Sequence, residues 1–140
     1  MKTVAIVGAG AIGTFLGTYL ARTGADVSVL ARGKTAAALR THGFRFEEGG
    51  ALRTAPVRVV EETTALGRQD LVVLAVKGPS LPGLAEKIRP LLGPDTVVLT
   101  AMNGVPWWFF SGLGGPHEGA RRYGRWTRTV ASPPRSRCGT

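Results

Sequence analysis

The chain has 140 residues, of which 44% are hydrophobic and 19% charged. This size and composition predict one domain with a buried core and exclude a wholly disordered protein. No uninterrupted apolar run is long enough for a membrane-spanning helix. The lone Cys138 excludes an intramolecular disulfide. With only His42 and His117 as further candidate ligands, we expect no metal site.

The start of the chain resembles a secretory signal in one respect, because Lys2 precedes a largely apolar stretch that runs to Ala21. Regularly placed glycines interrupt this stretch, however, and no small-x-small cleavage site ends it. We therefore expect a soluble cytoplasmic protein.

The first thirty residues predict a strand, a helix and a second strand. Thr3–Val7 is rich in β-branched residues and bounded by glycine, as is typical of a strand buried on both faces. A helix should begin near Ala11–Ile12 and end at Gly24, and Val27–Leu30 should form the next strand. The apolar residues of this helix form one stripe: Ile12, Phe15, Leu16, Tyr19 and Leu20. Together these elements form a βαβ unit with a right-handed connection.

Further strands and helices are predicted to alternate along the rest of the chain. In order they are a helix at Thr35–Thr41 closed by Gly43, short strands at Phe44–Phe46 and Val57–Val60 around the Gly49-Gly50 turn, a buried strand at Leu71–Val76, a helix opened by Ser80 and Pro82 and stopped by Gly93-Pro94, and a strand at Thr96–Thr100. Such alternation predicts a Rossmann-like, doubly wound α/β fold with a mostly parallel sheet covered on both faces.

The composition changes after Gly112, so we expect a first domain at residues 1–112 and a tail at 113–140. The formal net charge is +9, and the tail holds 6 of the 18 basic residues but only 1 of the 9 acidic ones. Dominated by Arg, Gly, Ser and Pro, it is expected to be disordered. A nucleic-acid-binding arm, with Tyr123 and Trp126 stacking on bases, is the less favoured reading because the arginines follow no helical face.

A glycine-rich turn between the first strand and the first helix carries the chemistry. Its sequence fits G-x-G-x-x-G: Gly8, Ala9, Gly10, Ala11, Ile12 and Gly13. The first glycine permits the tight turn, the second lets the backbone approach a pyrophosphate, and the third lets helix and strand pack closely. The helix N-terminus then offers free N–H groups to the phosphates. The alternative is a glycine-rich turn that binds no ligand.

The residues after the second strand indicate which dinucleotide binds. A carboxylate there would bind the ribose hydroxyls of NAD, but Arg32 and Lys34 stand in that region instead. The guanidinium of Arg32 can bind a 2′-phosphate through charge-assisted hydrogen bonds, so the predicted cofactor is NADP. The alternative for Arg32 is a solvated surface residue.

Two polar residues follow later strands, where open α/β sheets place their ligands. Lys77 follows Leu71–Val76, and Asn103 follows Thr96–Thr100 in an Asn-Gly step. Both are predicted to contact the cofactor, and Asn103 also the substrate. The alternatives are a solvated lysine and a simple Asn-Gly turn. Asp70 is interpreted as a residue at a helix-to-strand junction rather than a base, and His42 as a residue on the surface at a helix end.

Three segments of this sequence together resemble the N-terminal NADP-binding domain of ketopantoate reductases (2-dehydropantoate 2-reductases). They are VAIVGAGAIGTFLGTYLARTGADVSVLARG, ALGRQDLVVLAVK and LLGPDTVVLTAMNGVPWWFF, and they cover about residues 1–112. The resemblance implies that the glycine turn and Arg32 hold NADP, and that Lys77 and Asn103 line the cleft between cofactor and substrate. Many relatives have Gln before that Asn, where Met102 stands here.

The resemblance implies NADPH-dependent reduction of 2-dehydropantoate, a 2-keto acid, to pantoate in pantothenate and coenzyme A synthesis. In the family, the general-acid Lys and a substrate-binding carboxylate lie in a helical C-terminal domain. No such domain follows here, so we expect this chain to be inactive by itself. We also expect that a frameshift replaced the second domain, which would leave the aromatic residues 107–110 at risk of exposure. Translating the downstream DNA in the other two frames tests this.

Two other functions remain open at this stage. One is a reductase of the same superfamily that acts on another 2-keto acid or ketone. The other is a non-catalytic module that senses dinucleotides. No membrane or nucleic-acid partner is expected, and nothing in the sequence indicates an oligomeric state.

Overall fold

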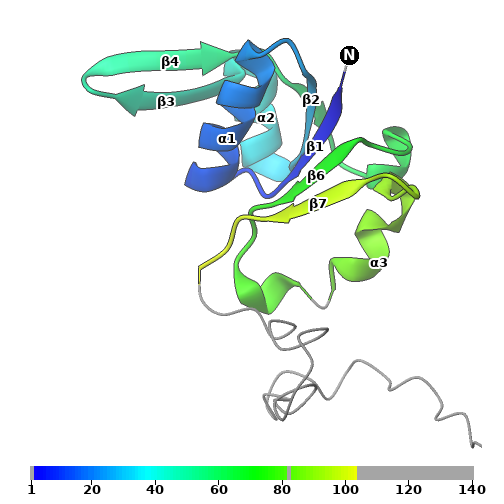
Figure 1. Cartoon of the computed structure of the whole chain (residues 1–140). Coiled ribbons are helices and arrows are strands. Elements are labelled where there is room, and N and C mark those ends of the chain that lie inside the picture. The colour runs from blue at the N-terminus through cyan, green and yellow to red at the C-terminus, as the bar shows by residue number, and fades with distance from the viewer. Residues whose placement is uncertain (1, 82, 104–140) are drawn as a thin grey trace, which may run out of the picture. The chain divides into compact units, whose positions relative to one another are not determined.

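A computed structural model describes residues 2–81 and 83–103 of the chain (Figure 1). The residues up to Met102 belong to one compact unit. Its elements are β1 (Thr3–Val7), α1 (Ala11–Arg22), β2 (Asp26–Leu30), α2 (Gly33–His42), β3 (Phe44–Glu48), β4 (Ala51–Ala55), β5 (Arg58–Val60), the 3-10 turn η1 (Thr63–Ala65), β6 (Leu71–Leu74), η2 (Gly78–Ser80), α3 (Ala85–Ile88), η3 (Arg89–Leu91) and β7 (Val97–Thr100). No helix in this part of the chain is long and apolar enough to span a bilayer. The tail predicted at 113–140, and its boundary at residue 112, lie outside the described residues.

Five strands form one sheet in the order β5-β2-β1-β6-β7, and every neighbouring pair in it is parallel. From β1 the chain first adds strands on one side, β2 and then β5, and afterwards returns to add β6 and β7 on the other. The strand order therefore reverses between β1 and β6. This arrangement confirms the predicted Rossmann-like, doubly wound α/β fold.

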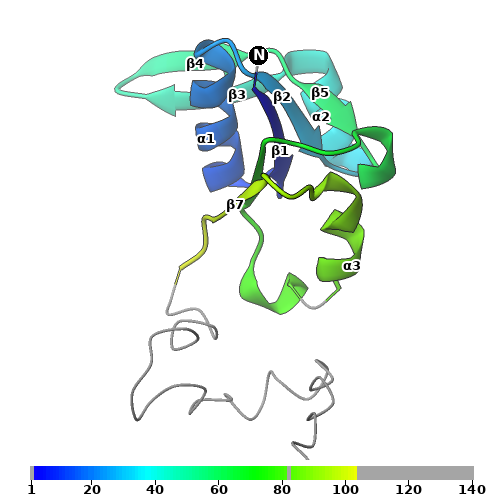
Figure 2. The same cartoon turned by 45° about the vertical axis from the view of Figure 1, so that its right-hand side comes forward.

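The core lies on both faces of this sheet, because successive side chains of a strand point to opposite faces. Val4 and Ile6 of β1 pack with residues of α1 and α2, whereas Ala5 and Val7 pack with Leu84 and other residues of the α3 region. The two views in Figures 1 and 2 agree that α1 and α3 lie on opposite sides of β1 and β6. A strand that is apolar at every position is what this two-sided burial requires.

Helix α1 packs through its glycines rather than through the whole predicted apolar stripe. Gly17 is buried, and a Cβ atom built there would lie 2.5 Å from the ring of the fully buried Phe44. Phe15 and Tyr19 are 40% and 39% exposed and form edge contacts with each other at a ring-centroid distance of 5.1 Å. Phe15 also contacts Phe46 of β3, at 5.3 Å. The stripe therefore divides, because Leu16 and Leu20 pack against the core whereas Phe15 and Tyr19 contact Phe46 of the β3–β4 hairpin.

The hairpin corrects one prediction. Two short strands were expected at Phe44–Phe46 and Val57–Val60 around Gly49-Gly50, but β3 pairs antiparallel with β4, at Ala51–Ala55, across that turn. The segment near Val57–Val60 instead forms β5, which joins the main sheet parallel to β2. The sequence of β4, ALRTA, has a single β-branched residue, so propensity gives little sign of the strand.

The predicted helix from Ser80 to Leu92 is also wrong in its length. The structure has η2, a four-residue α3 and η3 in its place. Pro90 lacks an N–H, and its ring clashes with a continuing helix, so regular α-helix ends at Ile88. The strand predicted at Leu71–Val76 ends at Leu74, two residues earlier than expected.

Asp70 connects β1 to β6 at the end of the sheet where both strands begin. Its carboxylate accepts hydrogen bonds from the Thr3 amide at 2.7 Å and the Thr3 hydroxyl at 3.0 Å, and Lys2 lies 3.9 Å away. The amide hydrogen bond, the hydroxyl hydrogen bond and the charge of Lys2 lower the pKa of this carboxyl. This contact is structural, because it lies at the amino-terminal end of the two strands and the glycine turn lies at their carboxyl end.

Asp70→Asn is expected to lower the thermal stability of the chain slightly at neutral pH. A carboxyl with a lowered pKa in the folded state stabilises that state above its unfolded pKa of about 4. The stabilisation is lost as the pH falls through the lower, folded pKa. Thermal unfolding measured from pH 7 to pH 3 should therefore show the two Tm values converging. Asp95→Asn removes another exposed carboxylate as the control, and an equal loss in that variant would contradict the assignment.

Candidate dinucleotide-binding site

The glycine turn lies where the strand order reverses, at the carboxyl ends of β1 and β6. The Ala75 amide donates a hydrogen bond to the Val7 carbonyl at 2.8 Å, so the segments that follow the two strands are joined. Gly8 has a φ of +111°, and a Cβ atom there would lie 2.6 Å from the Ala75 carbonyl oxygen. Both the backbone conformation and the close approach require glycine at this position. In open α/β sheets this crevice is where ligands bind.

Gly13 allows the first turn of α1 to pack directly on the turn that precedes it. A Cβ atom on Gly13 would lie 1.9 Å from the Gly8 carbonyl oxygen and 3.2 Å from Cγ2 of Ile6. Backbone atoms occupy the space that a side chain would need. The third glycine of the motif thus sets the distance between helix and strand.

Gly10 differs from the other two glycines, because a Cβ atom on it would meet nothing within 4 Å. Gly10 is the N-cap of α1, no side chain caps this helix end, and no acidic residue lies in its first turn. The adjoining Ala9 and Ala11 have short side chains, and Ile12 is 54% exposed. Open space thus adjoins uncapped N–H groups at the positive end of a 12-residue helix. These features fit the diphosphate of a dinucleotide.

Arg32 lies just past the end of β2, as the N-cap of α2, with an exposed side chain. Its Nη2 atom lies 2.5 Å from Oε1 of Glu62, and its Nε donates to the Glu61 carbonyl oxygen at 3.2 Å. The side chain therefore already contacts an acidic segment at the end of β5. Lys34 is exposed in the first turn of α2. Sequence reasoning missed both glutamates, because the strand before them was expected around the Gly49-Gly50 turn and not beside β2.

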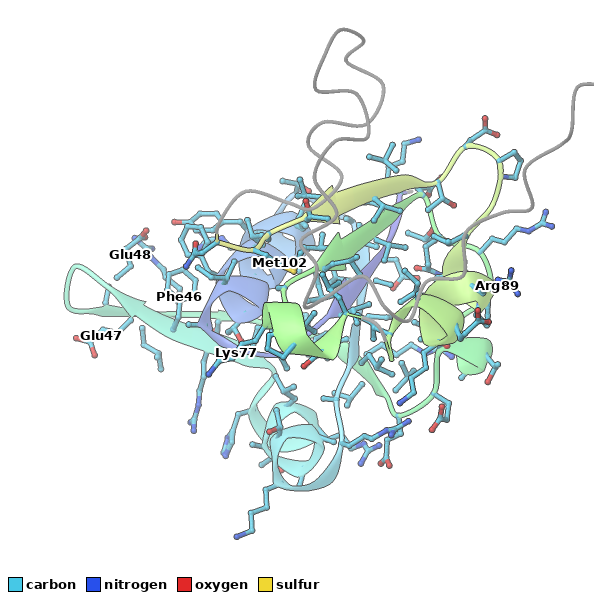
Figure 3. The ribbon with its side chains drawn as sticks, turned by 90° about the horizontal axis from the view of Figure 1, so that it is seen from below. Phe46, Glu47, Glu48, Lys77, Arg89 and Met102 are labelled. Atoms are coloured by element: carbon cyan, nitrogen blue, oxygen red, sulfur yellow. The ribbon has the colours of Figure 1, made fainter. Side chains whose placement is uncertain are left out.

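Lys77 follows β6 and immediately precedes η2, and its side chain is exposed (Figure 3). None of the ion pairs within residues 2–81 and 83–103 involves Lys77. Since β6 and β7 are parallel neighbours, the segments after them leave the sheet at the same edge. Ala101 continues this pairing by donating to the Leu74 carbonyl at 2.9 Å. Asn103, two residues on, is exposed and is the last described residue.

His42 and Asp70, the other polar residues named in the sequence analysis, lie outside this site. His42 is exposed in the last turn of α2, as predicted. Asp70 precedes β6 and so lies at the far end of that strand from Lys77. In the part of the chain that the structure describes, no three His, Cys, Asp or Glu residues come together as a metal site.

Comparisons with known proteins find relatives of this sequence and fold. A family model described as ketopantoate reductase PanE/ApbA matches residues 4–106. A 2-dehydropantoate 2-reductase from Mesorhizobium japonicum is 49% identical over 119 residues, which are 84% of this chain and 36% of that protein. The chain therefore spans about a third of the length of this relative.

Solved structures show the same likeness. The crystal structure of a candidate ketopantoate reductase from Ralstonia solanacearum MolK2 matches with a TM-score of 0.79 and 52% identity, over 85% of this chain and 37% of that one. The structure of 2-dehydropantoate 2-reductase from Geobacter metallireducens matches with a TM-score of 0.68 and 34% identity, over 74% of this chain and 35% of that one. With the family model matching most of its residues, this chain belongs to the ketopantoate reductase PanE/ApbA family.

Proposed function

We propose that this chain binds NADP(H) at the glycine turn, as the cofactor-binding part of an oxidoreductase that reduces 2-dehydropantoate to pantoate. The observation that carries the proposal is the open space beside Gly10, at the uncapped N-terminus of α1. The space lies at the reversal point of the sheet, and the neighbouring glycines have their Cβ positions blocked by backbone. A glycine turn that packs against backbone at Gly8 and Gly13 and is open at Gly10 is suited to bind a ligand beside Gly10.

Each site residue has a distinct part in this proposal. The N–H groups at the start of α1 bind the diphosphate, and Arg32, past the end of β2, binds the 2′-phosphate of the adenosine ribose. The family resemblance implies that Lys77, which follows β6, and Asn103, which follows β7, line the cleft between cofactor and substrate. Lys77 is an exposed cation, suited to attract an anionic keto acid. Asn103 carries an amide, which both donates and accepts hydrogen bonds.

The proposed reaction is part of pantothenate and coenzyme A synthesis and takes place in the cytoplasm. When bound, NADPH supplies the hydride that reduces the ketone. A proton donor must complete the reduction, and the family resemblance assigns that role to a lysine of a second, helical domain. In this proposal the described residues bind the cofactor and orient it toward the ketone, whereas the proton donor belongs to the second domain.

Arg32→Glu is expected to weaken NADPH binding to the 140-residue chain by about tenfold to a hundredfold, because hydrogen bonds to charged groups contribute about 1.5–3 kcal/mol. NADH has no 2′-phosphate, so its affinity should change little. Calorimetric titration of the wild type and the Arg32→Glu variant, each with NADPH and with NADH, measures both changes in affinity.

Arg45→Glu makes the same change of charge on the exposed hairpin strand β3 and serves as the control. The role of Arg32 is wrong if Arg32→Glu keeps the full preference for NADPH over NADH. The proposed function itself fails if the well-folded wild-type chain gives no heat with either nucleotide.

A further inference from the structure

The end of β5 brings two glutamates to the residue proposed to bind the 2′-phosphate. In the parallel register of β2 and β5, Leu30 is opposite Val60, and the Ala31 amide donates to the Val60 carbonyl at 3.0 Å. The residues that follow the two strands are therefore also side by side. This places Glu61 and Glu62 beside Arg32.

The two glutamates use their carboxylates differently. Glu62 pairs with Arg32, Oε1 to Nη2, at 2.5 Å, whereas Glu61 pairs with Arg40, Oε1 to Nη2, at 2.9 Å. Arg32 meets Glu61 only through the main-chain carbonyl, at 3.2 Å. Both side chains of the Arg32–Glu62 pair are more than half exposed, at 52% and 67%. The pair is therefore accessible from solvent and open to exchange with another anion.

A 2′-phosphate that binds Arg32 must compete with the Glu62 carboxylate for the same guanidinium. Either the ion pair breaks, or the phosphate sits close to a second negative charge. Both effects lower the affinity for NADPH. NADH carries a neutral 2′-hydroxyl instead, which needs no guanidinium and can donate a hydrogen bond to a carboxylate. Glu62 thus competes with the 2′-phosphate of NADPH, and it does not compete with NADH.

We propose that Glu62 is a specificity-determining residue that opposes Arg32 and limits the preference of the site for NADPH over NADH. The inference rests on the proposed function, because it requires that the 2′-phosphate bind at Arg32. Arg32 sets the preference for the phosphate, and Glu62 sets how large that preference becomes.

Glu62→Gln tests the inference, since the amide keeps the shape of the side chain and removes its charge. Glu62 makes no side-chain cap to η1, so the fold should be unaffected, and circular dichroism checks this. Titration at low salt should show NADPH affinity raised by about 1.5- to fivefold, the range expected for loss of an exposed ion pair. NADH affinity should stay the same or fall.

Glu61→Gln is the matched control, because it also removes one negative charge from this segment. The Glu61 carboxylate pairs with Arg40 and not with Arg32. It should leave the ratio of NADPH to NADH affinity close to that of the wild type. Adenosine 2′-monophosphate and adenosine 5′-monophosphate serve as small probes of the same contrast. Glu62→Gln should raise the affinity for the first and not for the second.

The possible outcomes separate this inference from the proposed function. If the wild-type chain prefers NADPH, Arg32→Glu abolishes that preference and Glu62→Gln leaves it unchanged, the proposed function stands and the role of Glu62 is wrong. An equal gain from Glu61→Gln overturns the inference too, because the effect would then come from net charge. If the wild type binds neither nucleotide, both proposals fail.

Discussion

Replacing Gly13 with alanine is expected to destabilise the chain by about 3 kcal/mol or more, the upper range for overpacking in a core. The added Cβ atom would lie 1.9 Å from the Gly8 carbonyl oxygen. That oxygen belongs to the backbone of the turn, so no side chain can rotate away to make room. The helix must shift off the sheet, which breaks packing along α1. A domain that is stable by about 5–15 kcal/mol loses a large part of its stability in this way.

Urea unfolding followed by circular dichroism measures this effect. Gly83→Ala is the control, because a Cβ atom there has nothing within 4 Å and its φ is not in the left-handed region. The control should unfold at nearly the same urea concentration as the wild type. A Gly13→Ala variant as stable as the control would show that α1 does not pack on the turn as closely as described.

Gly10→Ala is expected to produce the opposite combination, a stable fold that no longer binds dinucleotides. The Gly10 φ of −80° suits alanine, and its Cβ position is empty. Stability should therefore be kept or raised by about 0.4–1 kcal/mol, as for other compatible glycine-to-alanine changes. The new methyl group would occupy the space through which the diphosphate approaches the backbone. NADPH and NADH affinities should both fall by at least about tenfold, or about 1.4 kcal/mol.

The same urea and calorimetric measurements test this second prediction. Gly83→Ala again provides a variant with one added methyl group, placed outside the glycine turn. If Gly10→Ala binds both nucleotides as tightly as the wild type, the diphosphate does not lie at the turn. A loss of NADPH binding alone would point to the 2′-phosphate instead of the diphosphate.

The elements around the glycine turn were predictable because their local and long-range requirements agree. An apolar strand, three glycines at fixed spacing and an amphipathic helix all indicate the same βαβ unit, and the structure confirms β1, α1 and β2. The blocked Cβ positions at Gly8 and Gly13, and the open one at Gly10, match the separate roles that the motif assigns to them. Cofactor binding by these residues stays a prediction.

The partner of Arg32 could not be predicted, because it depends on how strands pair. The sequence predicts Val57–Val60 as a short strand around the Gly49-Gly50 turn with Phe44–Phe46, which leaves Glu61 and Glu62 without a neighbour in the predicted site. In the structure the same segment forms β5 beside β2. Pairing of strands distant in sequence depends on tertiary packing, which local propensity does not report. Knowing that β5 runs parallel to β2 would have been enough to place the glutamates beside Arg32.

The hydrogen bond from the Ala75 amide to the Val7 carbonyl has a consequence for the spacing of the segments that follow β1 and β6. It fixes the turn after β1 against the segment that leads to Lys77 through main-chain atoms alone. Side-chain substitutions elsewhere on the surface are therefore expected to leave the separation between these two segments unchanged. Misplacement of reacting groups by about 1 Å can slow an enzyme a hundredfold. A junction made by main-chain atoms protects against that error, so the proposed effect of Glu62 on nucleotide preference does not require the spacing of these segments to change.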